Sequence, residues 1–257
     1  MNLCDLSTDW LVSAGQAAPR TRWRLTPLTA TSTPHQGGIA LGPGEVHAWL
    51  VDLDDRAELR AVELDDAERD RAGSYLRPRD GARFAASRAA LRLVLAGYLG
   101  RAPVSLRFLV DLRGRPRLAD RELQFSLARS AGLALIAVSL RPVGADLERV
   151  ESRPGLADVA AARFSAGEAA CIAAGCGGSP TQGFYRHWTA KEAYLKAVGH
   201  GLAGLRQAEL ACGPRPAIRL GGRPAAGWAL SVIDAPAGYA AAIAASQPVT
   251  QWWRLAA

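Results

Sequence analysis

Two acidic residues two positions apart, Asp146 and Glu148, are the first candidates for chemistry in this chain. If residues 145–150 form a strand, both carboxylates point from the same face of it. Adjacent carboxylates repel each other unless a cation joins them. Mg²⁺ suits such a pair because it takes oxygen ligands and is usually completed by substrate phosphates. The alternative is a pair of solvated acids at a strand edge.

The only two lysines among the 257 residues, Lys191 and Lys196, flank a third acidic candidate, Glu192. The other 29 of the 31 Lys and Arg residues are arginines, so a retained lysine indicates a position that needs a compact ammonium; the alternative is chance placement. In a helix that turns by about 100° per residue, Lys191 falls on the apolar face, whereas Glu192 and Lys196 fall together at its edge. The alternatives are a snorkelling Lys191 and an ordinary surface pair of Glu192 with Lys196.

The elements that must position these residues are a helix over residues 180–198 and a strand over 145–150. Ser179 and Pro180 are typical of a helix start, and Gly199 is typical of a helix end. The apolar run 133–140 precedes the acidic strand and is expected to form a hairpin with it. Further helices are predicted over residues 80–99 and 159–174.

The composition predicts a globular protein, with 49% hydrophobic and 21% charged residues. No apolar run approaches the roughly 18 residues of a membrane-spanning helix, and no secretion signal is evident, so a cytoplasmic protein without a membrane partner is expected. The four cysteines fit no zinc or disulfide pattern. The net charge of +7 favours anionic partners. Nucleic acid is disfavoured because the arginines are dispersed rather than interleaved with aromatic residues.

The chain divides into three parts. Residues 1–44 are rich in Thr, Ser, Pro and Gly and are interpreted as an extension, partly disordered. Residues 45–140 and 141–257 each hold a set of helices and strands of similar size. The second set carries the acidic strand and the lysine-bearing helix. We find no sequence repeat between the two.

Two motifs carry a family resemblance. Gly144-Ala-Asp-Leu-Glu148, followed by Trp188-x-x-Lys-Glu-Ala-x-x-Lys-x-x-Gly-x-Gly-Leu202, resembles the signature of the Sfp-type 4′-phosphopantetheinyl transferases. The turn Gly114-Arg115-Pro116 is similar to the Gly-Lys-Pro turn of that family. The resemblance covers roughly residues 45–245.

The resemblance implies an α+β fold of two similar halves related by a pseudo-twofold axis, with coenzyme A bound between them. It implies transfer of 4′-phosphopantetheine from coenzyme A to a serine hydroxyl of an acidic apo carrier protein, with release of 3′,5′-ADP, by a monomer. Carried over by motif, Asp146, Glu148 and Glu192 would hold Mg²⁺. Glu192 would also accept the serine proton, and Lys196 would neutralise charge on the departing group.

The same resemblance, together with the arginines of helix 80–99, gives a set of residues expected to contact coenzyme A. They are Arg83, Arg88, Gly114, Arg115, Pro116, Arg129, Lys191 and Lys196. The expected catalytic residues are Glu192, Lys196 and Glu148.

One segment departs from the family pattern. The family often carries Asn-x-Ser-His-Ser after the Gly-Lys-Pro turn, whereas Ala128 and Arg129 stand here at the first Ser and the His. Arginine binds phosphate at least as well as histidine, so coenzyme A binding is expected to survive. The departure motivates a second hypothesis, a non-catalytic homologue that binds coenzyme A or a carrier protein. A third, another Mg²⁺-dependent enzyme acting on a nucleotide pyrophosphate, lacks a Gly-x-x-x-x-Gly-Lys loop.

Overall fold

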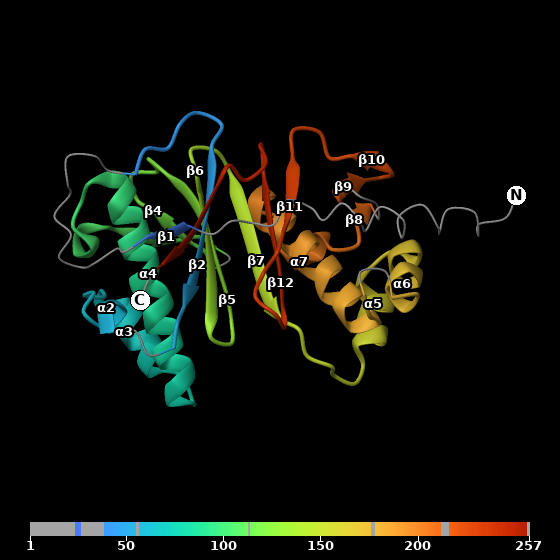
Figure 1. The fold of residues 1–257 in the computed structure, drawn as a ribbon, viewed down its shortest axis with the longest axis horizontal. Helices are drawn as coiled ribbons and strands as arrows, with labels where there is room; N and C mark the ends of the chain where they lie inside the picture. Colours follow the sequence, from blue (N-terminus) through green and yellow to red (C-terminus); the bar gives the residue numbers. More distant parts are fainter. Residues whose placement is uncertain are drawn as a thin grey trace, which may run out of the picture.

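Two β-sheets stack face to face in a computed structural model, and a long helix covers the outer face of each (Figure 1). The structure describes residues 24–26, 39–54, 57–112, 114–175, 178–211 and 216–255. Of the predicted extension 1–44, only residues 24–26 and 39–44 therefore fall within the described ranges. The mixture of helices and sheets confirms the predicted α+β class.

The first sheet has five strands in the order β1-β13-β2-β6-β5. Their bounds are β1 Arg24–Thr26, β2 Val46–Asp52, β5 Gln124–Ser130, β6 Leu133–Ser139 and β13 Gln251–Leu255. Strand β6 is antiparallel to both of its neighbours, β2 and β5, whereas β13 is parallel to both of its neighbours, β2 and β1. Because β13 comes from the end of the chain, the predicted second half contributes a strand to the sheet of the first.

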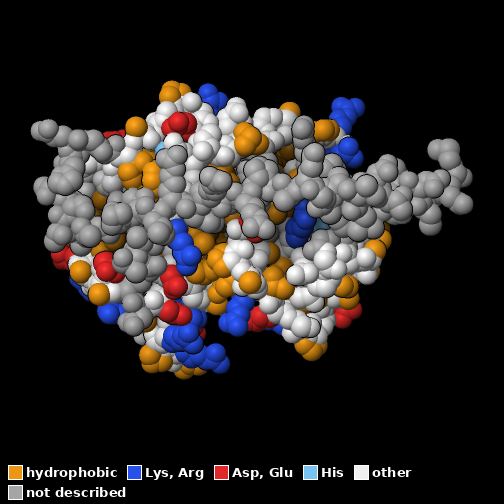
Figure 2. All heavy atoms as spheres, in the orientation of Figure 1, with side chains coloured by type: hydrophobic (Ala, Val, Ile, Leu, Met, Phe, Trp, Pro, Cys, Tyr) orange, Lys and Arg blue, Asp and Glu red, His pale blue; other side chains and the backbone are white. Residues whose placement is uncertain are grey.

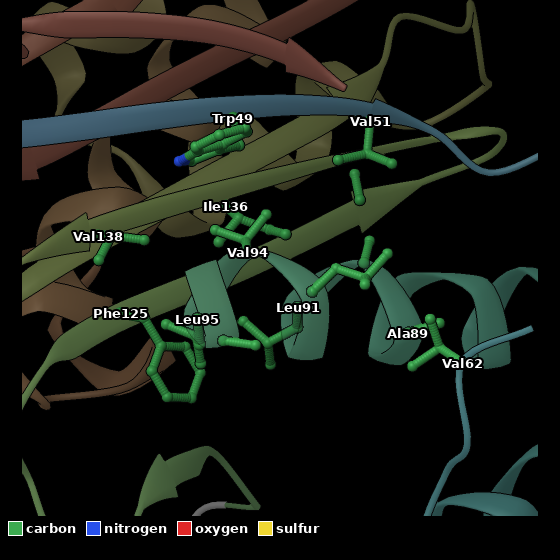
Figure 3. Close-up of a cluster of buried hydrophobic side chains, with 14 of the residues drawn as sticks. Trp49, Val51, Val62, Ala89, Leu91, Val94, Leu95, Phe125, Ile136 and Val138 are labelled. Carbon is green, nitrogen blue, oxygen red and sulfur yellow. The ribbon is translucent and has the colours of Figure 1, made fainter. Parts of the chain in front are cut away.

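Helix α4, Pro78–Leu99, covers the outer face of this sheet. Its buried stripe, including Leu91 and Leu95, packs against Trp49 and Ile136 of the sheet (Figure 3). The short helices α2, Ala57–Arg60, and α3, Asp66–Gly73, lie beside it. A separate two-stranded ribbon, β3 Phe108–Val110 and β4 Pro116–Leu118, follows the 3₁₀ helix Pro103–Ser105.

The second sheet has three antiparallel strands in the order β11-β12-β7. Their bounds are β7 Val143–Arg149, β11 Ala229–Ile233 and β12 Tyr239–Ala245. Helix α7, Pro180–Val198, covers its outer face, next to α5 Leu156–Arg163 and α6 Ala166–Ala173 (Figure 1). After the 3₁₀ helix Leu202–Gly204, a small sheet is formed by β8 Ala208–Ala211, β9 Ala217–Leu220 and β10 Arg223–Pro224.

Side chains of strand β7 alternate between an apolar face, which packs between the sheets, and a face that carries Asp146. Val143, Ala145 and Leu147 are buried in the cluster between the two sheets. The intervening Gly144 and Asp146 contact α7 on the opposite face. Since side chains alternate across a strand, Glu148 belongs to that second face as well. The acidic pair is therefore presented to the helix that carries the two lysines.

The predicted hairpin between residues 133–140 and 145–150 is wrong. Strand β6 pairs with β2 and β5 in the first sheet, whereas β7 pairs with β12 in the second. The turn between them carries the chain from one sheet to the other. All seven residues of β6 are buried, because the strand lies between a helix on one face and the second sheet on the other. Short-range sequence signals cannot separate such a crossover from a hairpin.

The helix predicted over residues 159–174 is two helices, α5 and α6. Ser165 ends the continuity because its side chain accepts a hydrogen bond from the N–H of Glu168, while the Glu168 side chain accepts one from the N–H of Ser165. This capping box starts a new helix. Among the described residues, no helix combines the length and apolar character needed to cross a lipid bilayer.

Candidate active site

The predicted catalytic residues meet between β7 and α7. The Lys196 ammonium donates to Oδ1 of Asp146 at 2.5 Å. Asp146 is only 4% exposed, and its second oxygen, Oδ2, is buried without a hydrogen-bond partner. The Lys196 side chain is 28% exposed, so solvent reaches this group from the lysine side. The carboxylate thus has one oxygen committed to the protein and one oxygen available.

Gly144 sets how closely α7 approaches β7. A Cβ added at this position would lie 2.0 Å from the carbonyl oxygen of Ala193 and 2.4 Å from the backbone nitrogen of Ala197. Both contacts are with helix backbone, which cannot move aside as a flexible side chain could. The absence of a side chain at Gly144 therefore lets the last turns of α7 lie directly on the strand. This approach brings Lys196 within reach of Asp146.

Glu148 is held by a residue of the other sheet. Ser130, at the end of β5, donates to Oε2 of Glu148 at 2.9 Å, and its hydroxyl accepts the N–H of Arg149 at 3.0 Å. This bridge ties the first sheet to the acidic strand. Ser130 was not predicted as a site residue. It occupies the last Ser of the family's Asn-x-Ser-His-Ser pattern, which was the available signal.

Burial raises the pKa of all three acidic candidates, and neighbouring carboxylates add to the shift at two of them. Burial raises the pKa of Asp146 and of Glu148, and Asp146 raises the latter further. Burial, then Asp146 and Glu148, raise the pKa of Glu192 to about 7, although Lys196 opposes the shift. Glu148 and Glu192 therefore both lie within the field of Asp146. Even so, no group of three acidic, histidine or cysteine residues in the described chain is arranged as a formed metal site.

Lys191 does not reach these carboxylates. It is 0% exposed, and its ammonium donates to Oε2 of Glu168 at 2.7 Å while lying 4.5 Å from the ring centroid of Phe164. Glu168 is completed by the N–H groups of Ser165 and Leu210. The expectation that Lys191 contacts coenzyme A is thus corrected, and so is the snorkelling alternative. The ion pair is closed on all sides, and burial lowers the pKa of the lysine.

Arg88 is corrected in the same way. Its Nε donates to Oε1 of Glu68 at 2.7 Å, and its guanidinium lies 4.7 Å from the ring centroid of Phe108. The residue is only 7% exposed. The carboxylate of Glu68 balances the charge of Arg88 inside the first half, so this guanidinium is not placed to bind a phosphate. Neither Glu68 nor Glu168 was predicted, although each is the fourth residue of a capping-box pattern in the sequence.

Arg83 and Arg129 lie nearer the surface. Arg83 makes two hydrogen bonds to Asp54, at 2.8 and 2.7 Å. Arg129 donates to the hydroxyl of Tyr75 at 2.5 Å, and its guanidinium lies over the rings of Tyr75 and Phe84. Figure 2 shows basic side chains, with acidic ones beside them, around an indentation at the lower edge of the molecule. Asp54 opposes the charge of Arg83, whereas the hydroxyl partner of Arg129 is neutral.

The turn Gly114-Arg115-Pro116 connects β3 with β4. Gly114 adopts a φ of +77°, a left-handed conformation that glycine takes without strain. The Arg115 guanidinium donates to the carbonyl oxygen of Lys196. The turn therefore touches the end of α7 that carries Lys196, whereas the sequence predicted it only as a coenzyme A contact.

A half-open cavity of about 250 Å³ lies beside the acidic strand. Its lining comprises Val150, Gln182, Arg186, Thr189, Val232, Ile233, Gly238, Tyr239, Ala240 and Ala241. Ala240 pairs with Glu148 across β12 and β7, and Thr189 lies one helical turn before Glu192. The cavity thus adjoins the carboxylates on the side of α7 where that helix begins.

The sequence is similar to those of known 4′-phosphopantetheinyl transferases. A model of the 4′-phosphopantetheinyl transferase superfamily matches residues 142–244. The 4′-phosphopantetheinyl transferase HetI of Nostoc sp. is 36% identical over 211 residues, which cover 79% of this chain and 88% of HetI. A putative 4′-phosphopantetheinyl transferase of Synechocystis sp. is 37% identical over 145 residues, covering 55% and 59% of the two chains. A Bacillus subtilis 4′-phosphopantetheinyl transferase is 31% identical over 114 residues, covering 44% and 50%.

The matched region contains both motifs and the β7–α7 contact described above. The extent of the match to HetI covers most of both chains. The protein therefore belongs to the 4′-phosphopantetheinyl transferase superfamily and is a transferase.

Proposed function

We propose that this protein transfers 4′-phosphopantetheine from coenzyme A to a serine hydroxyl of an acidic apo carrier protein. The observation that carries the proposal is the cluster of Asp146, Lys196 and Glu192 between β7 and α7. It combines an available carboxylate oxygen, a cation and a carboxyl group of raised pKa. The products are the holo-carrier protein and 3′,5′-ADP.

The reaction exchanges a phosphoanhydride bond of coenzyme A for a phosphate ester bond to serine. A bond forms between the serine Oγ and the phosphorus that bears pantetheine, and the P–O bond to the second phosphate of coenzyme A breaks. Such transfers depend on positioning and charge neutralisation more than on covalent help from the enzyme. Glu192 accepts the serine proton, directly or through water, since burial and the neighbouring carboxylates raise its pKa to about 7, where a general base works best near neutral pH. Lys196 neutralises charge on the departing 3′,5′-ADP.

The residues present fit a divalent cation. Asp146 offers a buried oxygen without a hydrogen bond, and its charge raises the pKa of both Glu148 and Glu192 beyond the effect of their burial. Asp146, Glu148 and Glu192 would hold Mg²⁺, whose preferred ligands are oxygen atoms. When bound, the ion would supply Lewis-acid stabilisation of the pyrophosphate. Ser130 orients Glu148 for this role through its hydrogen bond.

The surroundings suit the two substrates. Arg83 and Arg129 provide positive charge for the phosphates of coenzyme A near the junction of the halves. The cavity beside Glu148 has a largely apolar floor of Ile233, Ala240 and Ala241, which suits the pantetheine arm. The net charge of +7 favours encounter with an acidic carrier protein.

The test is intact-protein mass spectrometry of a panel of apo carrier proteins incubated with the enzyme, coenzyme A and Mg²⁺. We expect at least one carrier to gain a single phosphopantetheine, and we expect EDTA to prevent the gain. If no carrier in a panel spanning fatty-acid, polyketide and peptide synthesis gains mass while coenzyme A still binds, the proposal fails and the non-catalytic hypothesis replaces it.

A further inference from the structure

The ribbon formed by β3 and β4 reaches the catalytic helix through Arg115. Its guanidinium donates a hydrogen bond to the carbonyl oxygen of Lys196. The base of this side chain is fixed, because the N–H of Arg115 donates to Oδ1 of Asp111 at 2.9 Å and the N–H of Asp111 donates to the Arg115 carbonyl at 2.9 Å. A closed turn therefore presents Arg115 to α7.

The acceptor is a carbonyl group in the last turn of the helix, which has no hydrogen-bond donor within the helix. The last four carbonyl groups of an α-helix lack donors within the helix, and Lys196 lies two residues before the final residue, Val198. The backbone N–H groups of Gly199 and His200, which follow α7, both turn back to Leu195. Arg115 supplies a donor to Lys196 instead. Its positive charge also suits the negative end of the helix dipole.

We propose that Arg115 is a positioning residue for Lys196 rather than a ligand of coenzyme A phosphate. Lys196 is then fixed at three points: its ammonium by Asp146, its backbone by Arg115, and the adjoining turn by the close approach at Gly144. The inference rests on the proposed function, which gives Lys196 its catalytic role. It departs from the role that the resemblance implies for the middle residue of this turn.

The kinetic test compares Arg115→Ala with Arg117→Ala, an arginine of the same ribbon outside the contact with Lys196. Losing one hydrogen bond at the lysine backbone should lower kcat about fivefold, while KM and Kd for coenzyme A stay within about twofold. Arg117→Ala should change neither. Calorimetric titration with coenzyme A measures Kd without a carrier protein. A Kd raised about tenfold or more in Arg115→Ala would identify a phosphate ligand and overturn the proposal.

A second readout does not depend on activity. The chain has only two lysines, and Lys191 is fully buried, so limited acylation with an amine reagent followed by peptide mapping reports on Lys196. Releasing its backbone should loosen the pair with Asp146 and raise the acylation rate of Lys196 about fivefold in Arg115→Ala, but not in Arg117→Ala. An unchanged rate would overturn the proposal. If the wild-type enzyme modifies no carrier, the proposed function fails, whereas this measurement still decides the role of Arg115.

Discussion

The two halves of the molecule hold their long helices with similar buried ion pairs. In the first half Glu68, from the capping box that begins α3, pairs with Arg88 of α4. In the second half Glu168, from the capping box that begins α6, pairs with Lys191 of α7. Each glutamate thus starts a short helix and anchors the long helix that follows. Both pairs are closed to solvent, so they serve packing rather than chemistry.

The pairs differ in how many partners share the charge. Glu68 also accepts from Arg92 at 2.7 Å, and Arg92 bonds in addition to Asp65 and to two backbone carbonyls. Among the residues that the structure describes, Glu168 has Lys191 as its one cationic hydrogen-bond partner, and its other hydrogen bonds come from backbone N–H groups. In the first half two arginines neutralise the buried glutamate, so either can be lost without leaving it unpaired. In the second half a single lysine does so.

The surfaces beneath the two helices differ more. Helix α4 rests on apolar side chains, among them Trp49 and Ile136. Helix α7 also packs on apolar residues, Ala242 and Ala244 of β12. In addition it rests on Gly144 and Asp146 of β7, and its Lys196 pairs with that aspartate. Both long helices are thus anchored by a buried ion pair, and α7 adds a second ion pair, Lys196 with Asp146, on the strand beneath it. We expect changes at the anchoring pairs to affect stability and changes at the second pair to affect transfer.

The largest change in stability is expected from Glu168→Gln. It leaves the fully buried ammonium of Lys191 without a counter-charge, which should lower the free energy of unfolding by about 3–5 kcal/mol. Urea unfolding followed by circular dichroism measures this loss. The double variant Glu168→Gln/Lys191→Met removes both charges and should recover part of it. An unchanged unfolding midpoint for the single variant would show that the pair contributes nothing.

In the first half, Arg88→Met should cost less. Glu68 keeps Arg92, so the loss should resemble that of one charge-assisted hydrogen bond, about 1.5–3 kcal/mol. The same unfolding measurement, made beside Glu168→Gln, compares the redundant and the single arrangement. Equal losses in the two variants would contradict the difference drawn between the halves.

Gly144→Ala tests the contact on which the second ion pair depends. The added methyl group meets helix backbone at 2.0 and 2.4 Å, and the required shift of α7 should cost about 1–3 kcal/mol. Because Lys196 moves with the helix, the rate of transfer should fall as well. Gly73→Ala on α3 is the matched control, since nothing lies within 4 Å of its added Cβ. A Gly144→Ala enzyme with wild-type stability and rate would refute the assigned contact.

The smallest effect is expected at Asp54, on the surface of the first half. Hydrogen bonds from Arg83, followed by Arg79, lower the pKa of this carboxyl group to about 2 from its ordinary 3.8. A depressed pKa contributes stability above pH 3.8, and this contribution is lost as the pH falls through about 2. The side chain is 42% exposed, so solvent screening keeps the contribution below about 1 kcal/mol.

Acid unfolding of Asp54→Asn, compared with the wild type, measures this contribution. The two proteins should differ by less than about 1 kcal/mol at neutral pH and converge below pH 2. A difference that grows as the pH falls would have the wrong sign.

Local signals in the sequence predicted helix α7 well. Ser179, Pro180 and Gly199 give its bounds, and the structure confirms α7 at Pro180–Val198. Strand alternation put Asp146 and Glu148 on one face, and helix periodicity put Glu192 beside Lys196. These features depend on residues a few positions apart, whereas the ion pair of Asp146 with Lys196 joins residues 50 positions apart and was not predicted.

The wrong predictions concern residues whose contacts are made with partners far away in the sequence. Lys191 and Arg88 were expected to contact coenzyme A, but their carboxylate partners lie 23 and 20 residues earlier in the chain. The expected hairpin failed because the partner of β7 is β12, close to the end of the chain. The sequence alone does not show which acidic residue the fold will place beside a basic side chain, so a buried ion pair cannot be told from a free phosphate-binding residue.

The measurement that tests the account most directly is the transfer rate and the unfolding free energy of Glu192→Gln, made on the same preparation. We expect carrier loading to fall by at least about a hundredfold, the lower range for loss of a general base, while the unfolding free energy stays within about 0.5 kcal/mol of the wild type. Normal loading by this variant would contradict the catalytic assignment.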